Sequence, residues 1–321
     1  MPEVKHIRSR DNPLLVRLRK LAAEPAAYRK LGLVWMEGEH LCSAWLQRGG
    51  VVVQAVVTEP GWDDPALRAL ASRAAAVAVV PPALMAGISM LESSPSIACC
   101  IPWAGAGELQ PGAPSVVLDR LQDAGNVGNL LRSASAFSFT QVIALKGTVA
   151  LWSPKVLRAG MGAHFALQMV EGVDEASLDV LGVPLLAGSS HAATAIHQLS
   201  LPWPCAWVMG HEGQGVSAGL LSRCAHVVRI PQPGGEESLN VAAAAAVCLY
   251  ESARASGGRR SGRSRSYPPS GAGGPGMRPP ISTSTGPAAG RAGWWWRSLR
   301  STCASTTATR FLRAASSPRP R

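Results

Sequence analysis

The sequence predicts an α/β protein in which helices cover both faces of a mostly parallel sheet. From residue 115 to residue 254, short apolar runs rich in β-branched residues alternate with stretches of helical periodicity. Glycine, asparagine, serine and glutamate gather directly after three of these runs, at 123–132, 210–216 and 236–241. Because open α/β sheets bind ligands at the carboxyl ends of their strands, the three segments together predict one ligand site.

This C-terminal region, 115–254, contains six candidate strands, nearly all followed by a candidate helix. We expect strands in SVVLD at 115, QVIAL at 141, FALQMV at 165, PLLAGSS at 184, CAWVM at 205 and HVVRI at 226. We expect helices to begin at Asn126, Ser153, Asp174, Val216 and Leu239, the last running to about Arg254.

Residues 1–101 are expected to form a smaller α/β unit. Helical spacing begins at Asn12, and a second helix is expected from about His40 to Arg48. Strands are expected in VVVQAVV at 51 and AVAVV at 76, with a helix between them and another near 83–91. Residues 102–114 are rich in proline and glycine without periodicity, so we expect a linker there.

The chain changes character after the last expected helix. Residues 255–321 are rich in Arg, Ser, Pro, Gly and Thr and contain no acidic residue and no apolar period. Such a composition cannot bury enough surface to offset the entropy of ordering, so we expect a disordered basic tail. Its abrupt onset also suggests an out-of-frame translation of GC-rich sequence, a hypothesis that the nucleotide sequence would decide.

The net charge of +11 does not by itself indicate nucleic-acid binding. Residues 252–321 contain 13 arginines and no acid, which leaves residues 1–251 at −2. Residues 1–30 nevertheless carry a net +5. This local excess predicts contact with RNA phosphates, although a solvated helix face is the alternative. The predicted RNA-binding side chains are Arg8, Arg10, Arg17, Arg19 and Lys20.

Several other classes of protein and site are disfavoured. No apolar run approaches the ~18 residues of a membrane span, and the first thirty residues lack a signal-peptide core, so we expect a soluble cytoplasmic protein. The seven cysteines lack zinc-site spacing and are expected to be buried thiols, with no metal bound. No GxGxxG follows a strand, and GHEGQG lacks the ending of a phosphate-binding P-loop, which argues against NAD, ATP and an oxidoreductase.

The three segments resemble the signatures of one family. LDRLQDAGNVGNLLRSASAF at 118, VMGHEGQGVS at 208 and RIPQPGGEESLNVAAAAAVCLYE at 229 are similar to the signatures of the SpoU (TrmH) branch of the SPOUT RNA methyltransferases. The resemblance extends over roughly residues 5–254. Two positions depart from the family: Ala242 and Gly160 stand where its members often have serine.

The resemblance implies more than the pattern of elements could. It implies a deep trefoil knot in the C-terminal domain, S-adenosylmethionine as methyl donor and a homodimer. It also implies methylation of a ribose 2′-hydroxyl, most favourably in 23S ribosomal RNA, with residues 1–101 as the RNA-binding domain. A tRNA 2′-O-methyltransferase and a noncatalytic RNA-binding protein of the same fold remain alternatives.

The resemblance also assigns site residues. Arg132 corresponds to the family's reactive arginine. Because arginine stays protonated in proteins, we expect Arg132 to clamp phosphate and stabilise a developing alkoxide. The other predicted catalytic residues are Asn126, Glu212 and Ser238, and the predicted cofactor-binding residues are Met209, Gly210, Gly213, Gly215, Ile230, Leu239 and Asn240.

Several of these residues allow a structural alternative. Arg132 could merely solvate a helix face, and some of the three glycines could serve only the turn. Asn126 could cap a helix instead of positioning the active site. Glu212 could orient Arg132, receive the proton, or be only a turn residue. Ser238 could hydrogen-bond near the reacting centre or cap the last helix.

Overall fold

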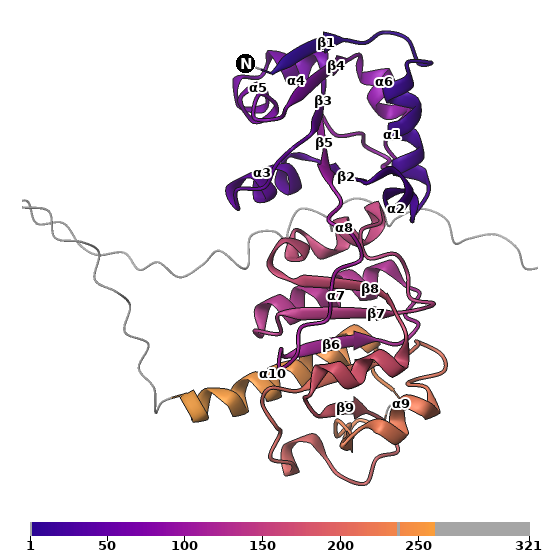
Figure 1. Ribbon diagram of the computed structural model, residues 1–321, viewed down its shortest axis with the longest axis vertical. Coiled ribbons are helices and arrows are strands. Elements are labelled where there is room, and N and C mark those ends of the chain that lie inside the picture. Colours follow the sequence, from indigo (N-terminus) through magenta and orange to yellow (C-terminus); the bar gives the residue numbers. More distant parts are fainter. Residues whose placement is uncertain (1, 236–237, 261–321) are drawn as a thin grey trace, which may run out of the picture. The chain divides into compact units, whose positions relative to one another are not determined.

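The computed structural model describes residues 2–235 and 238–260, which form two sheets and their helices within one compact unit (Figure 1). No helix in this described part is long and apolar enough to cross a membrane. Residues 261–321, most of the predicted tail, lie outside the described residues.

The N-terminal sheet has five strands in the order β1-β4-β3-β5-β2. β1, β4 and β3 run parallel, whereas β5 is antiparallel to both of its neighbours. Its strands are β1 Glu3–His6, β2 Leu33–Glu37, β3 Gln54–Thr58, β4 Ala76–Val80 and β5 Ile97–Pro102. Its helices are α1 Pro13–Ala23, α2 Ala27–Leu31, α3 Glu39–Gln47, α4 Glu59–Asp63, α5 Pro65–Ala71 and α6 Pro82–Ala86.

Three of these strands were not expected from the sequence. β1 is an edge strand of four exposed residues, two of them charged, so it carries no apolar signal. β2 lies between the first two expected helices and β5 follows the last one, and the apolar runs of both strands were not assigned. The helix expected near 83–91 was too long, because α6 ends at Ala86 and Gly87 caps it.

The C-terminal sheet has six strands in the order β11-β9-β10-β6-β7-β8, and every pair is parallel. The prediction of an α/β fold with a mostly parallel sheet is therefore confirmed. The strands are β6 Ser115–Leu118, β7 Gln141–Leu145, β8 Gln168–Val173, β9 Leu185–Gly188, β10 Ala206–Met209 and β11 His226–Val228. The helices are α7 Ala124–Ala136, α8 Pro154–Gly160, α9 Ala218–Arg223 and α10 Val241–Arg260, with 3₁₀ turns η1 Ala163–Ala166, η2 Glu175–Leu181 and η3 Ile196–Gln198.

Two expectations for this region were wrong. The helix expected from Asp174 is the 3₁₀ turn η2. The last helix continues to Arg260 instead of ending near Arg254, so the predicted tail does not begin at residue 255. No proline interrupts this stretch, and Ser256 is buried with its hydroxyl donating to the Ala253 carbonyl.

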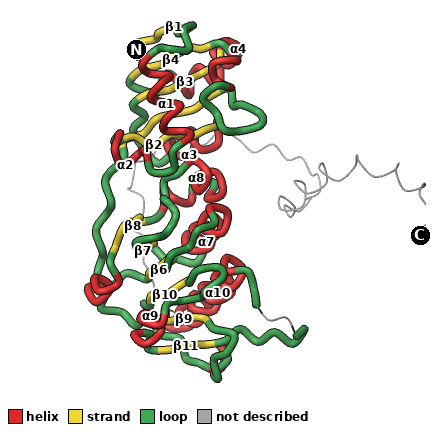
Figure 2. Tube along the Cα trace, turned by 90° about the vertical axis from the view of Figure 1, so that its right-hand side faces the viewer, coloured by secondary structure: helices red, strands yellow, loops and turns green. Residues whose placement is uncertain are grey.

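The two faces of the C-terminal sheet pack against different helices. Val116 and Leu118 of β6 belong to a core shared with α7, α8 and α10. Val117, between them, points to the opposite face and packs with η2 and α9. Figure 2 shows α7, α8 and α10 together on one side of the sheet. This two-sided covering explains why the strands are nearly continuous apolar runs.

Candidate active site

The first segment begins helix α7, directly after strand β6. The carboxylate of Asp123 caps this helix, accepting a hydrogen bond from the backbone N–H of Asn126 (2.6 Å). Asn126 therefore lies inside the first turn, and the interpretation of Asn126 as the cap is wrong. Its side chain is left free to make contacts with the other segments.

Glu212, from the second segment, receives hydrogen bonds from the first. One carboxylate oxygen accepts from the Asp123 backbone N–H (3.1 Å) and from the Asn126 side-chain amide (3.2 Å). The other accepts from the Gln122 backbone N–H (3.4 Å). Partial burial pushes the pKa of Glu212 up, but these hydrogen bonds, together with one from its own backbone, outweigh burial and lower the pKa.

Asn240 brings the third segment to the same point. Its side-chain amide donates to the Asn126 side-chain oxygen (2.9 Å). Its own side-chain oxygen accepts from the backbone N–H groups of Ala242 (2.9 Å) and Ala243 (3.3 Å), which caps helix α10. Asn240, not Ser238, is therefore the cap of the last helix, and Ser238 is exposed.

A chain of hydrogen bonds thus runs from Glu212 through Asn126 to Asn240 and joins the three predicted segments. β6 and β10 are neighbours, but β9 separates β10 from β11. The third segment meets the others only because the chain crosses back after β11 and α10 packs against α7 and β10. The three segments therefore converge although their strands are not all adjacent.

Asp119 was missed by the sequence analysis. It is buried, and its carboxylate accepts hydrogen bonds from the Ser217 backbone N–H (2.7 Å) and from Arg120 Nε (2.8 Å). Arg120 also donates to the Gln214 side chain (3.0 Å) and has a left-handed backbone, with φ of 58°. Burial opposes ionisation of Asp119, but the bonds from Arg120 and Ser217 prevail and lower its pKa. The sequence did carry a signal for this residue, because Asp119 directly follows the apolar run of β6.

The glycines of the second segment are not equivalent. A Cβ on Gly210 would lie 2.1 Å from the Val216 backbone nitrogen, so no other residue fits there. Gly215 has a φ of 69° and exchanges two backbone hydrogen bonds with His211, which closes a tight turn. A Cβ on Gly213 would make only ordinary contacts, at 3.9 Å from the His211 ring.

Apolar side chains lie on the strand ends and loops that carry these glycines. Met209 is buried at the end of β10, and Ile230 is partly buried against the core beneath α7 and α10. Leu239, next to Asn240, leaves 41 % of its surface exposed. Glycine-lined backbone beside apolar side chains fits a flat heterocycle such as the adenine of S-adenosylmethionine. Among the described residues, no three His, Cys, Asp or Glu side chains are grouped as a metal site.

Arg132 lies on helix α7 nearly two turns after Asn126 and is exposed. Within the described residues it makes no hydrogen bond or ion pair, and the partners of Glu212 there are backbone groups and Asn126. The expectation that Glu212 orients Arg132 therefore finds no contact in this part of the structure. The guanidinium of Arg132 is free to meet a ligand.

The predicted RNA-binding side chains lie on α1 and the loop before it. Arg8 pairs with Glu59 (3.8 Å) and Arg10 with Asp11 (4.0 Å), whereas Arg17 and Lys20 are exposed on α1. Arg19 is tied to the backbone, its Nε donating to the Leu15 carbonyl (3.3 Å). These long pairs between exposed groups leave the face basic.

Five of the cysteines are buried as expected, namely Cys42, Cys99, Cys100, Cys205 and Cys248. Burial raises the pKa of Cys205 and Cys248 to about 12, so both thiols stay protonated. Cys224 is half-buried, and Cys303 lies outside the described residues.

Comparisons with known proteins decide the family. The sequence profile of the SpoU rRNA Methylase family matches residues 113–250, which contain all three segments. An uncharacterized tRNA/rRNA methyltransferase of Synechocystis is 30 % identical over 262 residues, which cover 78 % of this chain and 94 % of that protein. The chain belongs to the SpoU family. The resemblance predicted from the sequence is confirmed.

The similarity to two further proteins extends over both sheets of this SpoU protein. The 23S rRNA (guanosine(2553)-2′-O)-methyltransferase RlmP of Bacillus subtilis is 27 % identical over 254 residues, covering 77 % of this chain and 98 % of RlmP. A crystal structure of an RNA 2′-O ribose methyltransferase superposes with a TM-score of 0.67 at 28 % identity, covering 78 % of this chain and 99 % of that one. The similarity thus includes the N-terminal sheet.

Proposed function

We propose that this SpoU protein is an S-adenosylmethionine-dependent RNA methyltransferase that acts on a ribose 2′-hydroxyl. The hydrogen-bonded chain from Glu212 through Asn126 to Asn240 carries the proposal, because it brings the three signature segments to one point. A 23S ribosomal RNA substrate is favoured by the similarity to RlmP along nearly its whole length. Such a substrate would place the enzyme in the cytoplasm.

In this proposal the cofactor binds among the second and third segments. Gly210, Gly213 and Gly215 present backbone to it, while Met209, Ile230, Leu239 and Asn240 hold the adenine. When bound, S-adenosylmethionine supplies an electrophilic methyl group whose transfer forms a C–O bond, breaks an S–C bond and releases the hydroxyl proton.

The protein's own side chains orient the reactants. Arg132 clamps an RNA phosphate and stabilises the developing alkoxide through its planar fork of donors. Glu212 stays ionised and fixes the amide of Asn126, since its oxygens already accept from three donors. Ser238 is proposed to donate a hydrogen bond near the reacting oxygen.

We further propose the organisation implied by the family. Residues 1–101 bind RNA through Arg8, Arg10, Arg17, Arg19 and Lys20, residues 102–114 link the two domains, and the catalytic domain begins at residue 115. The crossing of the chain after β11 to a helix beside α7 supports a trefoil knot. The functional unit is proposed to be a homodimer.

Replacing Arg132 with lysine tests the central role. Arg132→Lys keeps the charge but loses the planar fork, so methyl transfer should fall by orders of magnitude while cofactor affinity stays near wild type. Methyl incorporation into ribosomal RNA and calorimetric titration with S-adenosylmethionine measure the two effects. Arg68→Lys, at an exposed position of α5, is the matched control.

Two outcomes would count against this proposal. Retained methyl transfer in Arg132→Lys would remove Arg132 from the mechanism. A wild-type protein that binds no S-adenosylmethionine at millimolar concentration would instead favour the noncatalytic RNA-binding alternative.

A further inference from the structure

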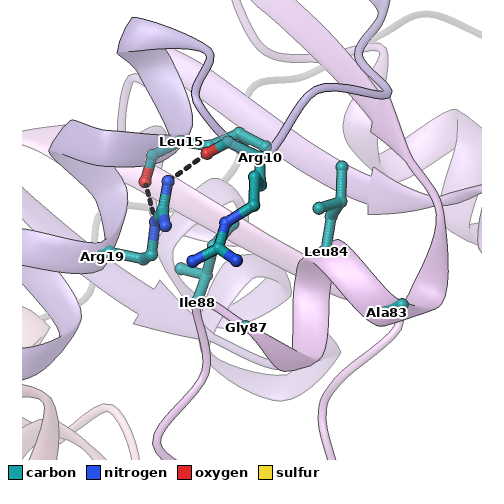
Figure 3. Close-up of a pocket in the computed structure, with 7 residues that line it drawn as sticks. All are labelled: Arg10, Leu15, Arg19, Ala83, Leu84, Gly87 and Ile88. Carbon is teal, nitrogen blue, oxygen red and sulfur yellow. Dashed lines mark hydrogen bonds between the residues drawn. The ribbon is translucent and has the colours of Figure 1, made fainter.

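A cavity of about 290 Å³ lies in the N-terminal sheet domain, away from the three signature segments. One side is formed by Arg10, Leu15 and Arg19, from α1 and the loop before it. The other side is formed by α6 and the residues after it, namely Ala83, Leu84, Gly87 and Ile88 (Figure 3). Two of the residues proposed above to bind RNA, Arg10 and Arg19, line this cavity.

Two small residues, Ala83 on α6 and Gly87 at its C-terminal cap, line the cavity. Gly87 has a negative φ, and a Cβ there would make only ordinary contacts with the carbonyls of Ala83 and Leu84, at 3.5 Å. The backbone therefore does not require glycine at this position. Leu15 and Arg19 are one helical turn apart, so both side chains lie on the α1 face that lines the cavity.

The walls combine an apolar floor with hydrogen-bond donors. Leu15 and Ile88 lie almost fully buried beneath the cavity, and the exposed Ala83 and half-buried Leu84 supply the apolar surface of its floor that a ligand can meet. Arg19 is fixed in place by hydrogen bonds to the carbonyls of Leu15 and Arg10. Among the described residues, no carboxylate lines the cavity, and the charged groups in its walls are the guanidinium groups of Arg10 and Arg19.

Arg10 differs from Arg19 because, among the described residues, its head group makes only one long ion pair. Its guanidinium lies across the cavity between Arg19 and Leu84 (Figure 3). Its ion pair with Asp11 is 4.0 Å long and joins two exposed side chains. Such a pair contributes little stability, so the guanidinium can turn toward a ligand.

We propose that this cavity binds one unpaired nucleobase of the RNA substrate, with guanine preferred. The inference rests on the proposed function as an RNA-binding enzyme. The volume is at the lower end of ligand pockets and suits a single base. The apolar floor receives the flat ring, while Arg10 pairs with the two acceptors on the O6/N7 edge of guanine or stacks on the ring.

This site would supply a preference that phosphate contacts cannot. Contacts between Arg or Lys and phosphates position RNA but do not read its sequence. A base held between α1 and α6 would select RNA with an unpaired guanine at the matching place. The N-terminal domain would then take part in choosing the methylated nucleotide.

The test compares two labelled oligouridylates, one with a central guanosine and one with an abasic site there. The full-length wild-type chain should bind the guanosine RNA about tenfold more tightly, the scale of one stacked base. Phosphate contacts, including those of the arginine-rich C-terminal residues, are common to both RNAs and cancel in the ratio. Equal affinities in wild type would mean that the cavity meets phosphate only, and would overturn the proposal.

Filling the cavity should remove this preference. In Ala83→Trp the affinity ratio should fall to about one, because the indole occupies the space of the base. Ala86→Trp, at an exposed position of the same helix that does not line the cavity, should keep the wild-type ratio. A preference retained in Ala83→Trp, or lost equally in both variants, would contradict the assignment.

A second pair of variants does not depend on packing. Arg10→Gln should lower the ratio, whereas Arg68→Gln on α5 removes the same charge and should leave it unchanged. Equal ratios in the two variants would overturn the role of Arg10. Calorimetry with S-adenosylmethionine on the same proteins separates this inference from the enzymatic one, since loss of cofactor binding would leave the base preference measurable.

Discussion

The carboxylate of Glu212 is a structural anchor that must stay ionised. Its oxygens accept from Asn126, Asp123 and Gln122, and these bonds lower its pKa below the usual 4.5. Because the folded pKa is depressed, the stabilisation it provides is complete above pH 4.5 and is lost as the pH falls through the lower folded value. A carboxylate held in this way is a weak base, which favours positioning over proton transfer.

Glu212→Gln tests this anchoring. The amide would place a donor against backbone N–H groups, so we expect S-adenosylmethionine affinity to fall severalfold at pH 7. The difference between wild type and variant should shrink as the pH is lowered below 4.5. Calorimetry across this range measures it, with the exposed Glu92→Gln as control. A difference that grows at low pH would contradict the sign of the pKa shift.

At the residue scale, the sequence predicted which side chains form the site, but not which of them cap helices. The sequence identified Asn126, Glu212 and Asn240, which the structure joins by hydrogen bonds. It could not show that Asp123 caps α7 and Asn240 caps α10, because a cap depends on the exact residue at which a helix begins. Asp119 was missed because its role depends on Ser217, 98 residues away.

At the scale of elements, the packing of α7 on α8 sets the position of the first segment. A Cβ on Gly128 would lie 2.2 Å from the Ala159 Cβ and 2.6 Å from the Ala159 carbonyl carbon. Both helices begin directly after strand-end loops, and α7 carries Asn126 and Arg132. The close contact at Gly128 therefore sets the distance of α7 from α8, and with it the positions of Asn126 and Arg132.

Gly128→Ala should force these helices apart. Overpacking of this kind costs about 1–3 kcal/mol, so the variant should unfold at lower denaturant concentration with an unchanged slope. Gly87→Ala, at a compatible backbone position, should be neutral or slightly stabilising. Equal denaturant midpoints for Gly128→Ala and wild type would show that α8 can shift to accept the added methyl group without loss of stability.

Alternation of short apolar runs with helical spacing located the strands of the C-terminal sheet within a few residues. The same approach missed β1, because a four-residue exposed edge strand has no pattern to detect. It also left the buried apolar runs of β2 and β5 unassigned. It also could not order the strands. β9 lies between β10 and β11 because of tertiary packing, which leaves no local trace in the sequence.

At the scale of the whole molecule, a buried carboxylate links the two sheets. Glu171 of β8 accepts hydrogen bonds from the Tyr28 hydroxyl (2.6 Å), from Arg29 (2.9 Å) and from the Leu151 backbone N–H (2.9 Å). Burial, then the charge of Glu171, raises the pKa of Tyr28, which keeps the hydroxyl a donor. Removing hydrogen bonds from a buried carboxylate lowers the stability of the fold, so these contacts hold the two sheets together.

The described part of helix α10 extends to Arg260. Helix α10 packs on α7 and β10, and the Trp207 indole N–H donates to the Ser252 hydroxyl (2.8 Å). One turn later Ser256 is also buried. A chain ending at Arg254 loses that turn, whereas a chain ending at Arg260 keeps every described residue of the helix.

A chain of residues 1–260 should therefore melt at the temperature of the full chain and methylate the same nucleotide. Residues 1–254 should melt lower, by about 2–4 °C for each ~1 kcal/mol lost. Ending at Arg260 also removes ten arginines, so RNA affinity should fall mainly at low salt, with a shallower salt dependence. Calorimetric melting and mapping of 2′-O-methylation measure these effects. A 1–260 chain that unfolds, or that methylates another nucleotide at physiological salt, would show that residues 261–321 belong to the functional structure.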